Sequence, residues 1–143
     1  MLVRTILADK GGDVVVISPE STVDQAISLL AQKKIGAVVV TRGDGRIAGI
    51  LSERDIVRML AADGVDALGK PVSKAMTAKV KVCREDNSVN EVMGIMTQGR
   101  FRHLPVERDG KLAGIISIGD VVKRRIEEIE HEAEEIRNYI ASA

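Results

Sequence analysis

The sequence predicts an α/β protein built from two copies of one β-α-β-β-α unit, followed by an extended C-terminal helix. Residues 14–42 align with residues 80–108, and after a one-residue gap residues 45–58 align with residues 110–123. Both copies show the same order of strand-like and helix-like patterns. Because a unit of about 60 residues buries too little surface to be secure alone, the copies are expected to pack together. We expect approximate two-fold symmetry, with the sheets packed on each other and a cleft between the copies.

Each copy begins with a β-branched segment and a capped helix. Residues 14–17 and 80–83 are the predicted first strands. The helices open with Thr22-x-x-Gln25 and Ser88-x-x-Glu91, which are capping boxes. Apolar residues then recur at helical spacing and predict the buried faces of the two helices: Val23, Ala26, Ile27 and Leu30 in the first copy, and Val89, Val92, Met93 and Met96 in the second.

Two strands and a second helix complete each copy. The predicted hairpins comprise residues 37–41 with 46–51, and residues 103–107 with 111–116. The second helices are expected to start near Ser52 and Ser117. These boundaries predict four parts of the chain: a first repeat with its N-terminal segment (1–63), a linker (64–76), a second repeat (77–126) and a helical tail (127–143).

The last helix carries a heptad stripe. It is predicted from Asp120 to about Ala141, and its apolar residues follow a 4-3-4-3-4 spacing that is typical of helices that pack on other helices: Val122, Ile126, Ile129, Ala133, Ile136 and Ile140. Six glutamates lie between them. A solvated helix face explains these glutamates better than an acidic docking site does.

Composition excludes several functional classes. The 143 residues include 21 Lys+Arg and 21 Asp+Glu, so no basic surplus recruits nucleic acid or an anionic membrane. No apolar run approaches the roughly 20 residues of a membrane span. The N-terminus lacks a signal-peptide layout, and the single cysteine, Cys83, suits a reducing cytosol, so we expect a cytoplasmic protein. Without a metal-ligand spacing, a nucleophile–base pair or a phosphate loop, neither a metal site nor an enzyme is predicted.

The most informative residues lie where each hairpin meets the following helix. They read Gly49-Ile-Leu-Ser52-Glu-Arg-Asp55 and Gly114-Ile-Ile-Ser117-Ile-Gly-Asp120. The glycine permits close approach of backbone or ligand, the serine marks a helix N-terminus that favours an anion, and the aspartate can accept the hydroxyl hydrogens of a ribose. Arg54 suits phosphate, but Gly119 replaces it in the second copy. We therefore expect unequal sites, with Arg100, Arg102 or His103 contacting phosphate in the second.

The duplicated unit resembles a tandem CBS domain pair, or Bateman module, over about residues 14–125. The two motifs above carry the resemblance, together with Phe101-Arg-His-Leu-Pro-Val106 and Ala75-Met-Thr77. The resemblance implies a stand-alone, non-enzymatic signal-transduction protein or energy sensor of bacterial type. It implies an adenosine ligand (AMP, ADP, ATP, NAD(H) or S-adenosylmethionine) in the cleft between the repeats, with no required cofactor. It also implies a homodimer of four repeats that is read by an unknown protein effector.

The resemblance further implies that backbone groups near Ile17, Pro19 and Cys83 contact the adenine, and that Pro105 lies at the site. Taken alone, Cys83 is better explained as filling space at a strand end, and His103 as a structural or surface histidine. The complete predicted nucleotide-binding set is Ser52, Arg54, Asp55, Ser117, Asp120, Ile17, Pro19, Cys83, Arg100, Arg102, His103 and Pro105.

One alternative of a different class stays open. Ser-x-x-Asp at a helix start is also a capping-box variant, which explains the motif without any ligand. The protein would then be a dimeric interaction or scaffold protein whose C-terminal helix contacts a partner, with no physiological nucleotide. The occurrence of the motif at matched positions of both copies favours nucleotide binding.

Overall fold

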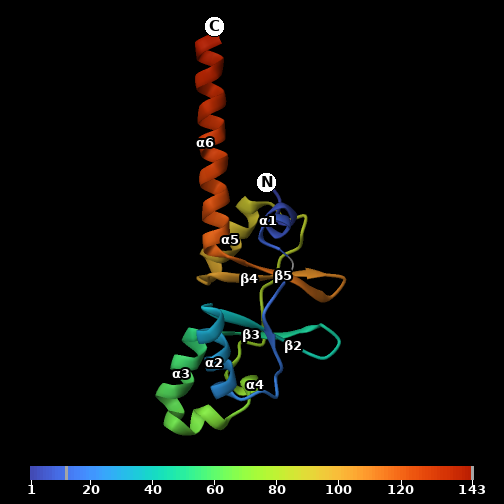
Figure 1. Cartoon of the computed structure of the whole chain (residues 1–143), viewed down its shortest axis with the longest axis vertical. Helices are drawn as coiled ribbons and strands as arrows, with labels where there is room; N and C mark the ends of the chain where they lie inside the picture. Colours follow the sequence, from blue (N-terminus) through green and yellow to red (C-terminus); the bar gives the residue numbers. More distant parts are fainter. Residues whose placement is uncertain (12, 143) are drawn as a thin grey trace.

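The computed structural model describes residues 1–11 and 13–142 and shows two α/β halves stacked end to end, with one helix projecting from the second half (Figure 1). The first half contains β1 (Val16–Ile17), α2 (Val23–Lys33), β2 (Ala37–Thr41), β3 (Ile47–Ser52) and α3 (Glu53–Asp63). The second contains α5 (Val89–Gly99), β4 (His103–Arg108), β5 (Lys111–Ser117) and α6 (Ile118–Ser142). Outside them lie α1 (Val3–Lys10), the 3₁₀ helix η1 (Gly64–Gly69) and α4 (Val72–Ala75). The predicted fold class is confirmed.

The two sheets differ by one strand. In the first half β1 runs parallel to β2, and β2 pairs antiparallel with β3. In the second half β4 pairs only with β5, so the strand predicted at residues 80–83 is wrong. Cys83 alone of those four residues is buried, and it makes a single parallel bridge to Val106. Because its other side chains are not buried, the segment gains little free energy from pairing along the sheet.

Helix starts follow the sequence closely. The amides of Gln25 and Glu91 donate to the hydroxyl oxygens of Thr22 and Ser88 at 3.1 Å and 3.0 Å, which confirms both predicted capping boxes. The last helix begins at Ile118, two residues before the predicted start, because the preceding serine caps it.

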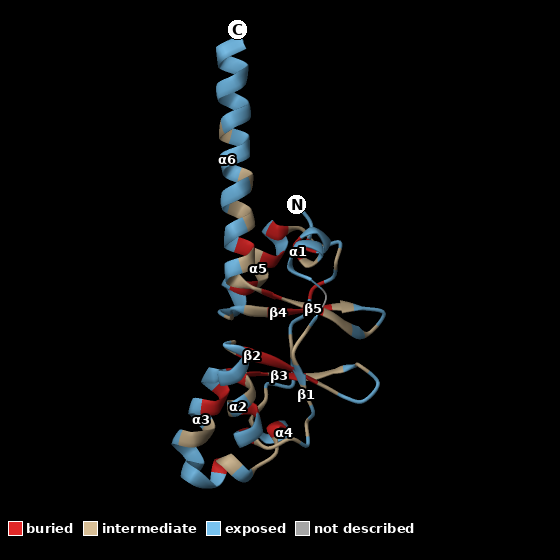
Figure 2. Cartoon of the chain, viewed as in Figure 1, coloured by how far each residue is buried: buried red, intermediate tan, exposed pale blue. Residues whose placement is uncertain are grey.

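Each of the two short flanking helices precedes one half in the chain and packs on the other half. Val3 and Ile6 of α1 lie in the core of the second half, whereas Val72 of α4 lies in the core of the first. Figure 2 shows these two buried clusters as separate regions. Helix α1 was not predicted. Its place matters, because each flanking helix leads directly to the Gly-x-x-Ser-x-x-Asp turn of the half on which it packs.

The two sheets face each other and meet at both ends of their hairpins (Figure 1). At the loop end, the Leu112 amide donates to the Gly45 carbonyl oxygen at 3.1 Å. At the opposite end, a Cβ built on Gly36 would lie 3.6 Å from Cε1 of His103. The start of β4 therefore lies against the start of β2, beside the turns that carry the motif.

Candidate functional site

The two motif turns have the same internal hydrogen bonds. The amides of Ser52 and Ser117 donate to Oδ2 of Asp55 and Asp120 at 3.0 Å and 2.9 Å. In return, the aspartate amides donate to the serine hydroxyl oxygens at 3.3 Å and 3.2 Å. Both turns are therefore capping boxes at the N-termini of α3 and α6. A capping box forms without any ligand, so the surroundings of each aspartate must decide its role.

In the first half, Thr77, the residue directly after the linker, covers the turn. Asp55 is only 9% exposed, and its Oδ1 accepts a hydrogen bond from the Thr77 hydroxyl at 3.2 Å. Thr77 and Ile50 also exchange two backbone hydrogen bonds. A Cβ at Gly49 would lie 2.7 Å from the Thr77 carbonyl oxygen. Glycine is needed here for the close approach of this chain's own backbone, and both oxygens of Asp55 already have partners.

In the second half, helix α1 supplies a charged neighbour. Nζ of Lys10 donates to Oδ2 of Asp120 at 2.8 Å and to the Ile115 carbonyl oxygen at 3.0 Å. The Asp120 side chain remains 26% exposed. All hydrogen bonds that Asp120 accepts from the described residues go to Oδ2. Its Oδ1 is therefore available as an acceptor, in contrast to Oδ1 of Asp55.

The electrostatics of this cluster favour an ionised aspartate beside a neutral histidine. Burial opposes ionisation of Asp120, but the hydrogen bonds from Lys10 and Ser117 outweigh it and keep the pKa of Asp120 below its usual value. Burial, followed by the positive charge of Lys10, lowers the pKa of His103, while the carboxylates of Asp120 and Glu53 act in the opposite direction. At neutral pH the site thus holds a carboxylate, an ammonium group and an uncharged imidazole.

The structure brings Ser117, Asp120 and His103 together and leaves two predicted arginines at the surface nearby. Arg102 is exposed, and its carbonyl oxygen accepts from the Ile118 amide at 2.8 Å, which places it at the N-terminus of α6. Arg100 is exposed at the left-handed C-cap of α5. Arg102 therefore adds a positive charge near His103, while Glu53 of the first half adds a negative one.

The remaining predicted residues lie elsewhere. Arg54 is exposed on α3, and Ile17 packs against the first core. The Pro19 carbonyl oxygen accepts from Ser73 at 3.0 Å. The Cys83 amide donates to the carbonyl oxygen of buried Pro105 at 3.0 Å, and the Cys83 carbonyl oxygen accepts from Glu107 at 2.9 Å. The backbone groups expected to contact adenine at Cys83 are thus bonded to β4.

Sequence reasoning missed Lys10. A signal for it was available, because the repeat offset of 66 residues places Lys10 at the position of Met76. Met76 lies against Gly49 in the first half, where a Cβ would be 2.8 Å from its sulfur. Extending the repeat towards the N-terminus would have placed a lysine next to the second motif.

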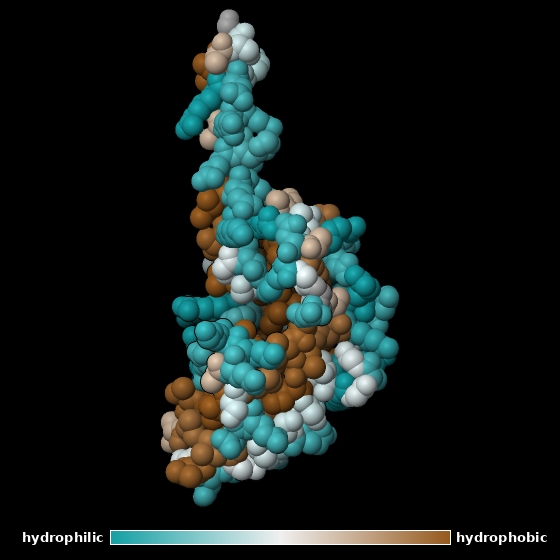
Figure 3. Space-filling view, in the orientation of Figure 1, coloured by the Kyte–Doolittle hydropathy of each residue, from teal (hydrophilic) through white to brown (hydrophobic). Residues whose placement is uncertain are grey.

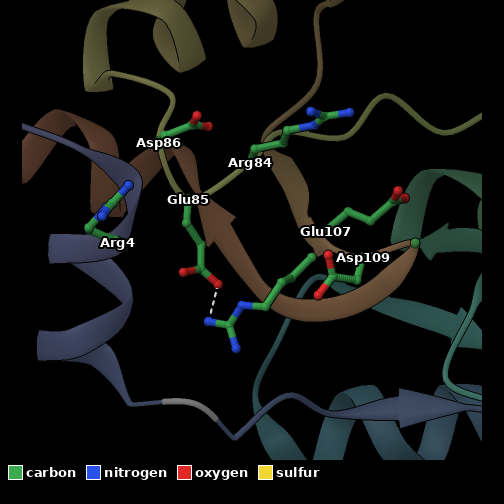
Figure 4. Close-up of a pocket in the computed structure, with 8 residues that line it drawn as sticks. Arg4, Arg84, Glu85, Asp86, Glu107 and Asp109 are labelled. Carbon is green, nitrogen blue, oxygen red and sulfur yellow. Dashed lines mark hydrogen bonds and ion pairs between the residues drawn. The ribbon is translucent and has the colours of Figure 1, made fainter.

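A separate pocket of about 360 Å³ opens on the second half and contains none of the predicted site residues (Figure 4). Three arginines and four carboxylates line it together with a glycine: Arg4, Arg84, Glu85, Asp86, Glu107, Arg108, Asp109 and Gly110. Arg108 and Glu85 form an ion pair across it. With the carboxylates in excess, this pocket has no surplus of positive charge for a phosphate.

Neither a metal-binding cluster nor a membrane-spanning helix is present in the part of the chain that the structure describes. Across residues 1–11 and 13–142, no group of three or more histidine, cysteine, aspartate or glutamate side chains is placed to hold a metal ion. Among the helices of that same part of the chain, none is both long enough and apolar enough to cross a membrane.

Comparison with known proteins identifies the family. Residues 3–62 and 72–127 each match the CBS domain, so the chain belongs to the CBS-domain family as a tandem pair. A CBS-domain-containing protein from Agrobacterium tumefaciens has the same fold, with a TM-score of 0.84 and 50% identity over 87% of this chain and 99% of that one. The structure of CBSX2 in complex with AMP is also similar, with a TM-score of 0.71 and 29% identity over 80% of this chain and 89% of that one.

Curated relatives include proteins longer than this chain. A 17.7 kDa protein from Acidianus ambivalens is 38% identical over 77% of this chain, and the Arabidopsis thaliana protein CBSX3 is 34% identical over 85%. The matches span 66% and 61% of those two relatives. CBS pairs are regulatory modules, and the structural neighbour CBSX2 binds AMP. These findings support a regulatory role for the chain and leave its ligand to be inferred from the site.

Proposed function

We propose that this CBS pair is a non-enzymatic regulatory protein that binds an adenosine nucleotide at the motif turn of the second half. In this proposal, Asp120 accepts hydrogen bonds from the ribose hydroxyls. Lys10, Arg102 and His103 face the phosphates, and Ser117 marks the N-terminus of α6.

One observation carries the proposal: Asp120 is part-exposed with Oδ1 available, whereas Asp55 is buried with both oxygens engaged. A carboxylate can accept two hydroxyl hydrogens only if solvent, and therefore ligand, can reach it. The AMP complex of CBSX2 supports the choice of an adenosine ligand. Adjacent cationic groups supply the charge-assisted hydrogen bonds that a phosphate requires.

The same contacts suggest how binding could be sensed. Lys10 ends helix α1, and the amino group of Met1, before α1, forms an ion pair with Glu128 of α6 at 3.0 Å. A nucleotide that competes for Asp120 or attracts Lys10 changes how firmly α1 holds the second half. Because a signal requires different ligand affinity in two states, the position of α1 relative to α6 is the proposed two-state element. We further propose that a homodimer presents this change to a protein effector.

Calorimetric titration of protein stripped of bound nucleotide tests the proposal. AMP, ADP, ATP, NAD, NADH and S-adenosylmethionine are compared with the wild type, Asp120→Ala and Arg54→Ala. We expect Asp120→Ala to weaken binding at least about tenfold, the loss typical of hydrogen bonds to a charged group. Arg54→Ala, which removes the exposed arginine of the first motif, should bind as the wild type does. A tenfold loss of affinity in Arg54→Ala with none in Asp120→Ala would overturn the assignment, provided that circular dichroism shows both variants to be folded.

A second candidate function is an interaction protein without a nucleotide. It is favoured by the apolar residues on α6, several of which are at least half exposed. If folded protein that has been stripped of bound nucleotide gives no heat of binding with any of the six ligands, this function is favoured over the nucleotide sensor.

A further inference from the structure

Helix α6 presents a long apolar stripe that nothing in the described chain covers. The exposure of its large apolar members rises from 43% at Val122 to 69% at Ile140. Figure 3 shows apolar side chains along one edge of this helix where it leaves the body. Buried contacts of α6 are confined to its base, where Val121 belongs to the second core. An amphipathic helix of this kind gains most of its stability from packing on its apolar face, so the stripe requires a partner.

The stripe defines a heptad register. Ile126, Ala133 and Ile140 occupy a positions, and Val122, Ile129 and Ile136 occupy d positions. The flanking g positions are then Arg125, Glu132 and Tyr139, and the flanking e positions are Lys123, Glu130 and Arg137. In a coiled coil, charges at e and g set partner choice and orientation.

When the whole stripe from Val122 to Ile140 is paired, these flanking charges complement a second copy of the same helix in parallel orientation. A g residue then meets the e residue five positions further along the partner. Arg125 therefore faces the partner's Glu130, and Glu132 faces the partner's Arg137. Symmetry doubles each of these attractive pairs. The charge pattern itself thus identifies the partner as another α6.

An antiparallel pair over the same seam places like charges together. Centred on position 131, it sets Lys123 against the partner's Arg137. It also sets Glu130 and Glu132 each against its own counterpart. All of these contacts are repulsive. With the whole stripe paired, the flanking charges therefore favour the parallel orientation over the antiparallel one.

We infer that two copies of this chain associate through a parallel two-stranded coiled coil of their α6 helices, which sets their second halves side by side. The base of α6 is attached firmly enough to transmit this geometry. Arg124, 17% exposed, forms an ion pair with Asp9 of α1, and Glu128 binds both Arg125 and the N-terminal amino group. The inference specifies the orientation of the homodimer proposed above and does not depend on nucleotide binding.

Disulfide trapping of the full-length chain tests the orientation. In a parallel pair, the two copies of residue 136 meet, so Ile136→Cys should give a covalent dimer on mild oxidation. Residues 126 and 136 lie about 15 Å apart along a helix, too far for a disulfide in that arrangement. A mixture of Ile126→Cys and Ile136→Cys should therefore give no 126–136 product. Burial raises the pKa of the native Cys83 thiol to about 12, so it does not compete.

Mass and charge reversal complete the test. Isoleucine at both a and d also suits larger assemblies, so the solution mass must equal two chains. Ile136→Asp should give one chain, while Asn138→Asp, the same charge on the outer face, should leave the dimer intact. Glu132→Arg should weaken the dimer roughly three- to tenfold, and adding Arg137→Glu should restore it. A mass of one or three chains, a 126–136 disulfide, or no rescue by the double reversal would overturn the inference.

Discussion

The two motif turns share a sequence pattern and a capping geometry, yet they have different neighbours. In the first half, Met76 at the end of the linker and the following Thr77 close over Gly49 and Asp55. In the second, α1 places Lys10 beside Asp120 and leaves that carboxylate partly exposed. The motif thus fixes the start of a helix, whereas the segment that packs over it sets how exposed its aspartate is. Four predictions test this contrast.

The largest expected difference in stability is between alanine substitutions of the two motif glycines. In Gly49→Ala, the new Cβ would meet the Thr77 carbonyl oxygen at 2.7 Å, and backbone there cannot move without breaking the pairing with Ile50. We expect the free energy of unfolding to fall by about 2–3 kcal/mol. In Gly114→Ala the Cβ would meet only the end of the Leu7 side chain, so the loss should stay below about 1.5 kcal/mol. Urea denaturation at pH 7 measures both, and equal losses would contradict the contrast.

The next largest difference in stability is expected between asparagine substitutions of the two motif aspartates. Asp55→Asn presents an amide group to hydroxyl and amide donors in a buried turn, so we expect a loss of about 1–2 kcal/mol in unfolding free energy. Asp120→Asn breaks a part-exposed ion pair and should cost about 0.5 kcal/mol. Thr77→Val removes the hydroxyl that donates to Asp55 and serves as control. Added to Asp55→Asn, it should recover part of the loss in unfolding free energy that Asp55→Asn causes. The reverse ranking of the two asparagine variants would show that the second turn is the closed one.

Removing the charge of Lys10 should affect phosphate recognition. We expect Lys10→Gln to weaken the binding of AMP about three- to tenfold. The affinity for adenosine, which lacks the phosphate, should stay nearly unchanged. Lys74→Gln, on the matched flanking helix α4, should alter neither affinity. Calorimetry with both ligands gives the ratio. A uniform loss for adenosine and AMP would assign Lys10 a structural role only.

The smallest effect is a pH dependence from His103. Its pKa in the folded protein lies below its usual 6.5, so the unfolded chain binds the proton more readily. Stability should therefore be unaffected above about pH 6.5 and should fall as the pH is lowered from there, by an amount of order 1 kcal/mol or less. His103→Gln should flatten this dependence, and His131→Gln, on the exposed part of α6, should not. Thermal melts between pH 5.5 and 8 provide the comparison.

Much of the fold could be predicted because it rests on local signals. The capping boxes at Thr22 and Ser88, the helical apolar spacing and the glycine-containing hairpin loops each act within a few residues. The missing strand at residues 80–83 and the added helix α1 could not be read this way. Strand pairing depends on burial against distant elements, and α1 is held by a core that forms 80 or more residues later in the chain.

The candidate site was predicted in type but not in detail. The aspartate and serine of each turn were found from the repeat, and their inequality was expected from Arg54 and Gly119. The structure adds a second difference between the turns: Thr77 contacts Asp55 and Lys10 contacts Asp120, each from a segment packed across the repeat boundary. No local pattern encodes such a contact, which follows only from the exchange of α1 and α4 between the halves.

Nuclear magnetic resonance mapping of backbone amides with AMP would show which of the two turns binds the nucleotide. If the second turn is the ligand site, shifts should cluster at residues 114–120, at His103 and near Lys10, while residues 49–55 stay in place. Shifts confined to residues 49–55, with the second turn unmoved, would contradict the assignment and make the turn of the first half the ligand site.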